Sequence, residues 1–336
     1  MATPFLLQMP DLDLADHLRV DLAEVERRLA DQVRADHPVL GPAANHLLQA
    51  GGKRFRPVMT LLAGMISAAD DGVGAARHDD VINAAVVVEL THLATLYHDD
   101  VMDEAAVRRG ADSVNARWGN STAVLTGDFL FARASDLLAD LGPAAVRIQA
   151  RAFARLVTGQ IDETAGPTQG QDRIQHYLSV VADKTASLIA ASAQLGSLLS
   201  GASPDAVQRL TEFGERIGVA FQLSDDLLDV AADAEDSGKT PGTDLREGVP
   251  TLPVLFAQRS VDPADARLLT LLDRPVAEAD VAEALALLRQ HPAMDMARSE
   301  LRRHAEAARE SLAPLPDGPA RRALADLCDV VVKRSG

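Results

Sequence analysis

The sequence has little cysteine, few aromatic residues and a shortage of positive charge. Cys328 is the only cysteine among 336 residues, so no disulfide can form within the chain and no cysteine metal cluster is available. This favours a reducing, cytoplasmic setting. Lys and Arg (33) are outnumbered by Asp and Glu (49), which gives a formal net charge of -16. Such a charge would repel a nucleic acid backbone, so we expect no nucleic acid partner.

Strand patterns and membrane signals are also missing. Aromatic residues make up only 3% of the chain, whereas 47% is apolar and dominated by alanine and leucine, which predicts an all-α protein. The N-terminus lacks the basic start of an export signal. Residues 185–204 are uncharged and long enough to cross a bilayer, but their Ser, Thr, Gly and Gln content predicts a buried bundle helix. We expect no membrane span, although the protein could work beside a membrane.

Glycine and proline divide the chain into predicted helices. We expect one domain over 1–336, with a motif-bearing core at about 40–253 and C-terminal helices over 254–336. A polar loop is predicted over 233–250. The helices before it are predicted at 11–35, 38–50, 57–69, 81–103, 113–141 with a break near Gly119, 143–164, 171–200 and 204–232.

An acidic motif, HDDVMD, follows the apolar run VINAAVVVEL. In a helix, His92, Asp99 and Asp103 stand seven and then four residues apart and share one face, with Asp100 about 100° round it. Carboxylates one turn apart repel each other unless a cation lies between them. A solvated acidic face is the ordinary interpretation of such a run. The apolar segment before it favours a site for a hard cation such as Mg²⁺ instead.

The same Asp-Asp-x-x-Asp spacing recurs in FQLSDDLLD. Gln222, Asp225, Asp226 and Asp229 fall at offsets of three, four and seven and share a helix face. Two copies in one helical chain argue against chance. The sequence therefore predicts two acidic helix faces that oppose each other and hold metal ions between them.

Basic residues occur in compact groups. GGKRFRP places Lys53, Arg54 and Arg56 beside a glycine pair, a combination that suits an anion because glycine allows close approach and the cations supply charge and donors. Arg108 and Arg109 follow the first acidic motif and are either a second anion site or charge balance.

Two lysines are further candidates. Lys184, next to Thr185, begins the uncharged helix and is either a phosphate contact or a snorkelling lysine. Lys239 lies in SGKTPGTD, which lacks the spacing and preceding strand of a nucleotide P-loop. The C-terminal pair Lys333-Arg334 either closes over the site or is a solvated tail, and the solvated tail is the favoured interpretation.

These features together suit the ionisation of an allylic diphosphate. Six carboxylates could hold two or three Mg²⁺ ions, and the basic groups could neutralise one or two diphosphates. Metal ions and cations would stabilise the leaving diphosphate, and a dry apolar cavity would protect a carbocation from water.

GGKRFRP, HDDVMD followed by RRG, and FQLSDDLLD followed by GKTPGTDLREG resemble the motifs of trans-isoprenyl diphosphate synthases of the polyprenyl synthetase family. The resemblance runs from about Leu40 to Pro253 and keeps the order and spacing of the motifs. It implies an all-α fold of about ten core helices around a deep central pocket, a Mg²⁺-dependent prenyltransferase activity, and a homodimer.

The resemblance also implies roles for individual residues. Isopentenyl diphosphate would be bound by Lys53, Arg56 and His92, with help from Arg109. The main metal ligands would be Asp99, Asp103 and Asp225, with Asp100, Asp226 and Asp229 ligating directly or through water. The allylic diphosphate would be contacted by Arg108, Lys184, Thr185, Gln222 and Lys239. Asp99, Asp103, Asp225 and Lys184 would be the catalytic groups, and the released diphosphate would act as the base.

Product length in this family depends on side chains just before the first acidic motif. Ala94 and Thr95 stand where short-chain enzymes tend to carry a bulky aromatic residue, and Thr91 lies deeper along the same helix. Their small size predicts a long-chain product, unless Phe129 or Phe131 forms a floor.

Other functions compete with this interpretation. A class I terpene cyclase shares the first motif and the cavity, but its second motif normally mixes Asn, Ser and Glu, and it has no need of GGKRFRP. A metal phosphohydrolase would use the His98-Asp99 pair and leave the second motif unexplained. A non-catalytic subunit that modulates a partner synthase would typically lack aspartates that are present here.

Overall fold

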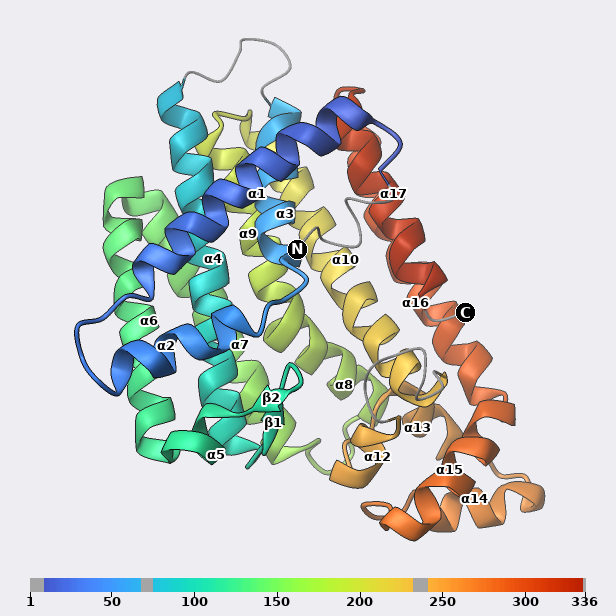
Figure 1. Cartoon of the computed structure of the whole chain (residues 1–336). Helices are drawn as coiled ribbons and strands as arrows, with labels where there is room; N and C mark the ends of the chain where they lie inside the picture. The colour runs from blue at the N-terminus through green and yellow to red at the C-terminus, as the bar shows by residue number, and fades with distance from the viewer. Residues whose placement is uncertain (1–8, 68–74, 232–240, 335–336) are drawn as a thin grey trace. The chain divides into compact units, whose positions relative to one another are not determined.

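The chain is all-α. The computed structural model describes residues 9–67, 75–231 and 241–334 and is drawn in Figure 1. By its contacts the chain divides into two compact units. Unit 1 comprises Met1–Ala152, Leu188–Thr211 and Pro314–Leu324, and unit 2 comprises Phe153–Ser187, Glu212–Ala313 and Ala325–Gly336. The single domain expected from the sequence stays a prediction, and the units are described in turn.

Unit 1 contains the first acidic motif and the basic segment. Two of its helix ends have specific causes. Asp11 Oδ1 accepts a hydrogen bond from the Leu14 N–H at 3.0 Å, and Gly51, with φ of 86°, follows the end of α2. The elements of its first segment are α1 (Leu12–Gln32), α2 (Leu40–Gln49), α3 (Phe55–Ser67), α4 (Ala75–Met102), β1 (Val107–Arg108), β2 (Ala111–Asp112), α5 (Val114–Trp118), α6 (Asn120–Leu141) and the start of α7 (Pro143–Ala165).

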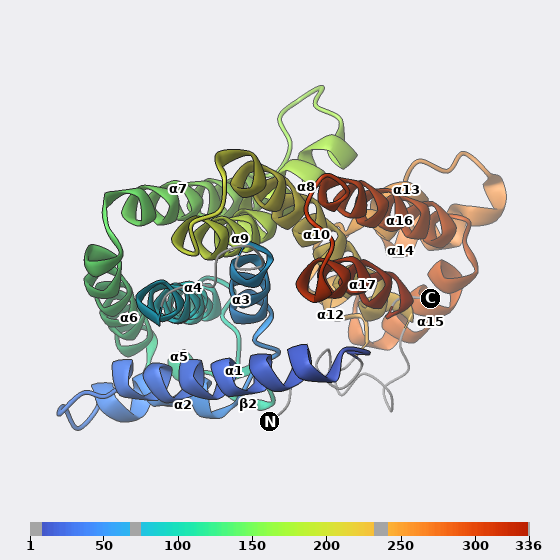
Figure 2. The ribbon, with the colours of Figure 1, turned by 90° about the horizontal axis from the view of Figure 1, so that it is seen from above.

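Helix α4 is the core of unit 1. It packs side by side with α6 and also contacts α3, while α1 and α2 run along the outside of these helices (Figures 1 and 2). Val86, Val87 and Val88 are completely buried, which shows that α4 is covered all round rather than on one face. By length and composition Arg77–Met102 could cross a membrane, but 78% of its most apolar window is buried inside the protein. A buried core helix accounts for its composition.

The uncharged segment after Lys184 is also a buried helix, as predicted. Most of α9 (Ser187–Leu199) lies in unit 1, and Ser192 and Ser197 are fully buried with their hydroxyls bonded to backbone carbonyls one turn earlier. A Cβ at Gly196 would lie 2.0 Å from the carbonyl oxygen of Thr60 in α3. The small residues therefore serve close helix packing.

Unit 2 holds the second acidic motif on α10 (Pro204–Ala231). The helix expected over 171–200 is three consecutive elements, because a π-helical turn, η2 (Ala182–Ala186), separates α8 (Arg173–Val181) from α9. The loop expected over 233–250 is wrong in part, since α12 (Thr243–Glu247) forms within it. The remaining elements are α13 (Leu252–Ala257), η3 (Pro263–Asp265), α14 (Ala266–Leu271), α15 (Glu278–Gln290), α16 (Ala293–Leu312) and α17 (Pro319–Lys333).

Candidate active site

The first acidic motif lies at the C-terminal end of α4. The N–H of Asp103 donates to the carbonyl of Asp99 at 2.8 Å, so one helical turn separates these two residues. Asp99 is half-buried and Asp103 is exposed. Two carboxylates on one accessible stripe are a suitable pair of oxygen ligands for a hard cation.

Asp100 is turned toward the protein interior. Its side chain is buried, Arg108 Nε donates to its Oδ1 at 2.6 Å, and Oδ2 has no hydrogen-bond partner. Burial raises the pKa of Asp100, and the guanidinium of Arg108 opposes that rise. Of the two interpretations of Arg108, this contact favours charge balance. Its contact with an allylic substrate stays a prediction.

The β1–β2 hairpin joins the RRG segment to the basic segment after α2. The pairing of Val107 with Asp112 was not foreseen from the sequence. At its tip Arg109 has a φ of 55° and donates to the backbone carbonyl of Gly51 and, at 3.1 Å, to that of Leu47. A Cβ at Gly52 would lie 3.1 Å from the Arg109 guanidinium carbon. The glycine pair thus allows Arg109 to approach GGKRFRP closely.

The three cations of GGKRFRP have different surroundings. Lys53 is exposed. Arg54 is 7% exposed and donates to Glu89, itself 2% exposed, at 2.9 Å and to Glu26 at 2.5 Å, so it forms a buried structural ion pair. Arg56 has a buried Nε with no hydrogen-bond partner. Arg56 thus has a buried donor that an anion could satisfy, and the roles that the resemblance implies for Lys53 and Arg56 stay predictions.

Positive charge accumulates around Arg56 and His92. Burial lowers the pKa of Arg56 to about 10, although Glu89 opposes the shift, and Arg109 adds to the lowering. Burial, followed by the charges of Arg56 and Arg109, holds the pKa of His92 well below its usual range. An anion in this cluster would relieve the repulsion and accept hydrogen bonds from the guanidinium groups. We call Arg56, His92 and Arg109 the cation cluster.

The depressed pKa of His92 makes stability depend on pH. Because the folded chain holds His92 neutral while the unfolded chain protonates it near about pH 6.5, the unfolded state binds more protons below that pH. The His92 contribution to the free energy of unfolding should therefore fall as the pH is lowered from 7.5 to 5.5, whereas the pKa of Asp226, which burial raises to about 7, acts in the opposite direction over this range. The difference in free energy of unfolding between the wild type and His92→Gln, measured by chemical denaturation across that range, isolates the His92 contribution. Inorganic diphosphate should reduce the pH dependence of this difference.

In the second acidic motif each carboxylate of α10 has a different neighbour. Arg334, which follows α17, donates to Asp225 and its guanidinium lies 5.1 Å from the ring centroid of Phe221. The expectation of a solvated C-terminal tail is therefore wrong at Arg334. Asp229 accepts hydrogen bonds at 3.1 Å from the N–H groups of Thr243 and Asp244 and so caps α12.

Asp226 is held by two donors. Tyr177 of α8 donates to its Oδ2 and Gln222 donates to its Oδ1 at 2.8 Å. Burial raises the pKa of Asp226 to about 7, and the hydrogen bonds from Tyr177 and Gln222 oppose the shift. Thr185 in turn donates to Gln222 at 3.1 Å. Thr185 and Gln222, which the resemblance assigns to the allylic substrate, thus lie in one hydrogen-bonded chain with this aspartate.

Lys184 lies in the π-helical turn η2 and donates to Glu163 of α7. Lys184 therefore has a specific acidic partner, and the interpretation as a snorkelling lysine does not describe it. Lys239 lies outside the described residues.

Comparison with known proteins identifies the family. The polyprenyl synthetase family model matches residues 37–288. A nonaprenyl diphosphate synthase of Mycobacterium tuberculosis is 49% identical over 331 residues, covering 98% of this chain and 97% of that protein. The chain belongs to the polyprenyl synthetase family.

Two further family members bear on fold and assembly. A crystal structure of geranylgeranyl pyrophosphate synthase from Corynebacterium glutamicum, complexed with calcium and isoprenyl diphosphate, superposes with a TM-score of 0.86 at 42% identity and covers 98% of this chain and 99% of that one. The all-α fold prediction is therefore confirmed. Component 2 of the heptaprenyl diphosphate synthase of Geobacillus stearothermophilus is 39% identical, with 94% of this chain and 96% of that protein covered.

His98, the histidine of a possible metal phosphohydrolase site, packs against another helix of unit 1. His98 Nε2 lies 3.1 Å from the carbonyl oxygen of Val124 and 3.5 Å from Asp128, both in α6. A Cβ at Gly127 would collide with the imidazole. His98 therefore packs against α6 and serves the contact between α4 and α6.

The residues expected to control product length line the interior of unit 1. Ala94 and Thr91 are completely buried, and Thr95 is 6% exposed. Gln149 of α7, also buried, donates to Thr91 Oγ1 at 2.6 Å and leaves its own amide oxygen without a partner. Asp99 lies eight residues after Thr91, so this buried polar pair is about 12 Å along the helix from the acidic motif.

The aspartates provide a donor set that fits magnesium. Among the residues that the structure describes, no group of three or more His, Cys, Asp or Glu side chains is arranged to hold a metal ion. Asp99 and Asp103 of unit 1 nonetheless carry hard carboxylate donors, which suit Mg²⁺ when phosphate and water supply the remaining positions, and Asp225 of unit 2 carries a donor of the same kind. The Arg334 guanidinium at Asp225 shows that this carboxylate accepts a cationic partner.

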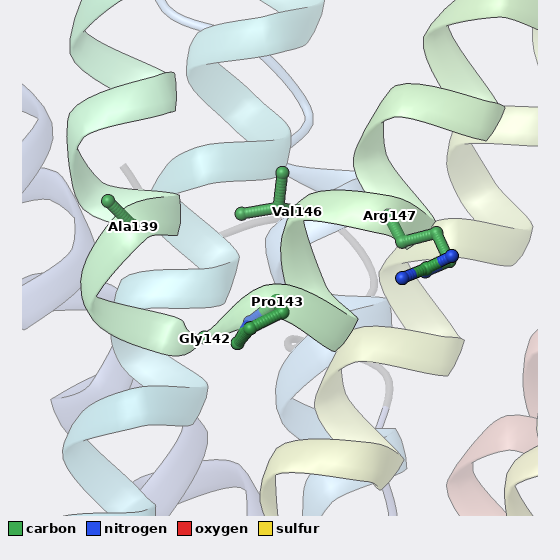
Figure 3. Close-up of a pocket in the computed structure, with 5 residues that line it drawn as sticks. All are labelled: Ala139, Gly142, Pro143, Val146 and Arg147. Atoms are coloured by element: carbon green, nitrogen blue, oxygen red, sulfur yellow. The ribbon is translucent and has the colours of Figure 1, made fainter.

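A surface pocket lies away from these residues. It has a volume of about 510 Å³ and opens at the turn from α6 to α7, where Gly142, Pro143, Val146 and Arg147 line it together with Ala139 (Figure 3). None of the predicted site residues that the structure describes contributes to it.

Two contacts of the predicted site residues were not foreseen from the sequence. Tyr177 stands seven residues before Lys184, a spacing that places both on one side of a regular helix, but nothing in the sequence pairs it with Asp226. Arg334 is 109 residues from Asp225, and no local pattern connects them. Both partners depend on how distant helices pack.

Proposed function

We propose that this family member is a Mg²⁺-dependent prenyl diphosphate synthase that condenses isopentenyl diphosphate with an allylic diphosphate. The cation cluster carries the proposal. The charges of Arg56 and Arg109 repel each other and keep His92 neutral, and Arg56 has a buried donor without a partner, so the cluster favours a multiply charged anion. A terpene cyclase uses one diphosphate and has no need of this second anion site.

Each group in the proposed reaction has a separate task. The cation cluster and Lys53 bind isopentenyl diphosphate, while Lys184, Thr185 and Gln222 orient the allylic diphosphate. Asp99, Asp103 and Asp225 would hold two or three Mg²⁺ ions, which would supply charge stabilisation for the leaving diphosphate. Asp100, Asp226 and Asp229 would ligate these ions directly or through water. The allylic C–O bond breaks, the double bond of isopentenyl diphosphate attacks the carbocation, and the released diphosphate takes up the proton lost from the product.

A direct assay tests the activity. Purified protein, Mg²⁺, isopentenyl diphosphate and allylic primers of increasing length should give polyprenyl diphosphates. An absence of product with every primer, both for the protein alone and after addition of the partner component of a two-component synthase, would contradict the proposal. Product only after that addition would support the alternative of a subunit that modulates a partner.

We propose a long-chain product. Small side chains at Thr91, Ala94 and Thr95 favour it, and relatives named for nonaprenyl and heptaprenyl products agree, whereas another is named for geranylgeranyl pyrophosphate. Ala94→Phe should shorten the main product by at least one isoprene unit, because the ring would occupy space beside the chain. Product chromatography measures this. An unchanged length would mean that the floor lies elsewhere, and farnesyl diphosphate as the sole wild-type product would contradict a long-chain enzyme.

We propose that the protein forms a homodimer and that it works in the cytoplasm. In unit 1, large apolar side chains remain exposed at Val124 and Leu125 of α6 and at Val146 of α7. Pairing with a second copy would remove them from water. Light scattering coupled to size exclusion measures the mass in solution, and a monomer at micromolar concentration would contradict the homodimer.

A further inference from the structure

The π-helical turn η2 is an irregular element that requires support from outside. A π turn adds one residue to the helical repeat and widens the helix, and such turns occur most often at functional sites. Here it separates α8 from α9 and carries Lys184 and Thr185. Its geometry therefore decides the direction in which these two side chains point.

One stripe of α7 contacts this turn. Arg155, Gly159 and Glu163 follow one another at intervals of four residues and so lie on the same face of the helix. A Cβ at Gly159 would lie 2.5 Å from the backbone nitrogen of Lys184, which shows that the two backbones touch at this point. Glu163 accepts the hydrogen bond from Lys184 Nζ.

Arg155 makes the most extensive contacts with the turn. Its Nε donates to Asp183 at 2.7 Å and its Nη2 donates to the carbonyl oxygen of Ala182 at 3.2 Å. The same guanidinium donates to both carboxylate oxygens of Glu215 in α10, at 3.0 and 2.5 Å. A planar guanidinium with several donors can fix three partners at once, which a lysine cannot do. Arg155 thus joins α7, the π turn and α10 within unit 2.

We propose that Arg155 is a positioning residue for the allylic diphosphate, acting through the π turn that carries Lys184 and Thr185. The inference rests on the proposed function, since it takes the allylic diphosphate as the ligand of those two side chains. Arg155 fixes the first residues of the turn, and Gly159 allows the turn to approach α7. Glu163 holds the Lys184 ammonium until a diphosphate replaces it. The isopentenyl diphosphate site uses none of these residues.

The test compares Arg155→Gln and Arg155→Lys with Arg151→Gln, which removes an exposed arginine one turn earlier on the same helix. Steady-state kinetics give kcat and the KM for each substrate, and calorimetry gives the Kd of a non-reactive thiolo analogue of farnesyl diphosphate. We expect Arg155→Gln to weaken binding of the analogue and to raise the KM for the allylic substrate, each by about tenfold or more. This is the effect expected if misplacement of Lys184 and Thr185 removes one to two charge-assisted hydrogen bonds to the diphosphate. The KM for isopentenyl diphosphate should change less than about twofold.

The controls separate positioning from general stability. Arg155→Lys should recover part of the affinity, and Arg151→Gln should match the wild type. An unchanged allylic affinity in Arg155→Gln, or equal increases in both KM values, would overturn the inference while leaving the proposed function intact. If Arg155→Gln does not fold, Arg155→Lys provides the same comparison of the two KM values. A wild-type protein that binds neither the analogue nor inorganic diphosphate would overturn the proposed function itself, and the inference with it.

Discussion

Replacing Asp99 by alanine should lower kcat by at least about a hundredfold, the effect of removing a key electrostatic group from a transition state. Asp99 is half-buried at the end of α4 beside the exposed Asp103, so its oxygens can reach a metal ion without unfolding the helix. Asp225→Ala should cause a loss of the same order, because Asp225 is the carboxylate of α10 that accepts a cationic partner. Initial rates of prenyl transfer at saturating Mg²⁺ measure both effects.

Glu104→Gln is the matched control for Asp99→Ala. Glu104 is an exposed carboxylate one residue beyond Asp103, and the proposed mechanism gives it no task. The kcat of Glu104→Gln should stay within about twofold of the wild type, and all variants should retain the wild-type circular dichroism spectrum. If kcat fell by less than about tenfold in both Asp99→Ala and Asp225→Ala, the effect would be too small for direct metal ligands and would contradict the assignment of these two aspartates as ligands.

Helix positions and chemical class were predictable because they depend on local patterns. The break at Gly119 separates α5 from α6 as expected, and Gly51 follows the end of α2. Both depend on glycine in a conformation that other residues rarely adopt. The positions of the lysines are a further local pattern that indicates site residues. The chain has four lysines, and Lys53, Lys184 and Lys239 all fall in motifs, whereas arginine supplies nearly all other positive charge.

The directions of individual side chains were not predictable in the same way. Asp99 and Asp100 are neighbours in one acidic run, yet Asp100 is buried against Arg108 while Asp99 remains accessible. A helix turns consecutive residues by about 100°, and the sequence does not show which side the rest of the fold covers. The π turn at Lys184 has the same cause, since the extra residue is stabilised by Arg155 from a different helix.

Two arginines in GGKRFRP should respond to mutation in opposite ways. Arg54→Leu should lower the free energy of unfolding by about 3–5 kcal/mol, because it leaves Glu89 buried without its partner. Arg56→Leu should leave stability unchanged or raise it, since burial and Arg109 already disfavour the Arg56 charge. The same change should weaken isopentenyl diphosphate binding by about ten- to a hundredfold, the loss of a charge-assisted hydrogen bond. Urea denaturation and calorimetry measure the two quantities.

A second substitution isolates the cause of the Arg54 effect. If the loss arises from the unpaired Glu89 carboxylate, Arg54→Leu combined with Glu89→Leu should recover most of the stability, since a buried ion pair replaced by apolar groups is often neutral. Failure to recover would mean that Arg54 stabilises the fold mainly through Glu26 or through its packing. If Arg56→Leu were destabilised but bound isopentenyl diphosphate normally, Arg56 would have the structural role that we assign to Arg54. It would also remove Arg56 from the anion site, because a side chain that binds substrate has no reason to hold the free protein together.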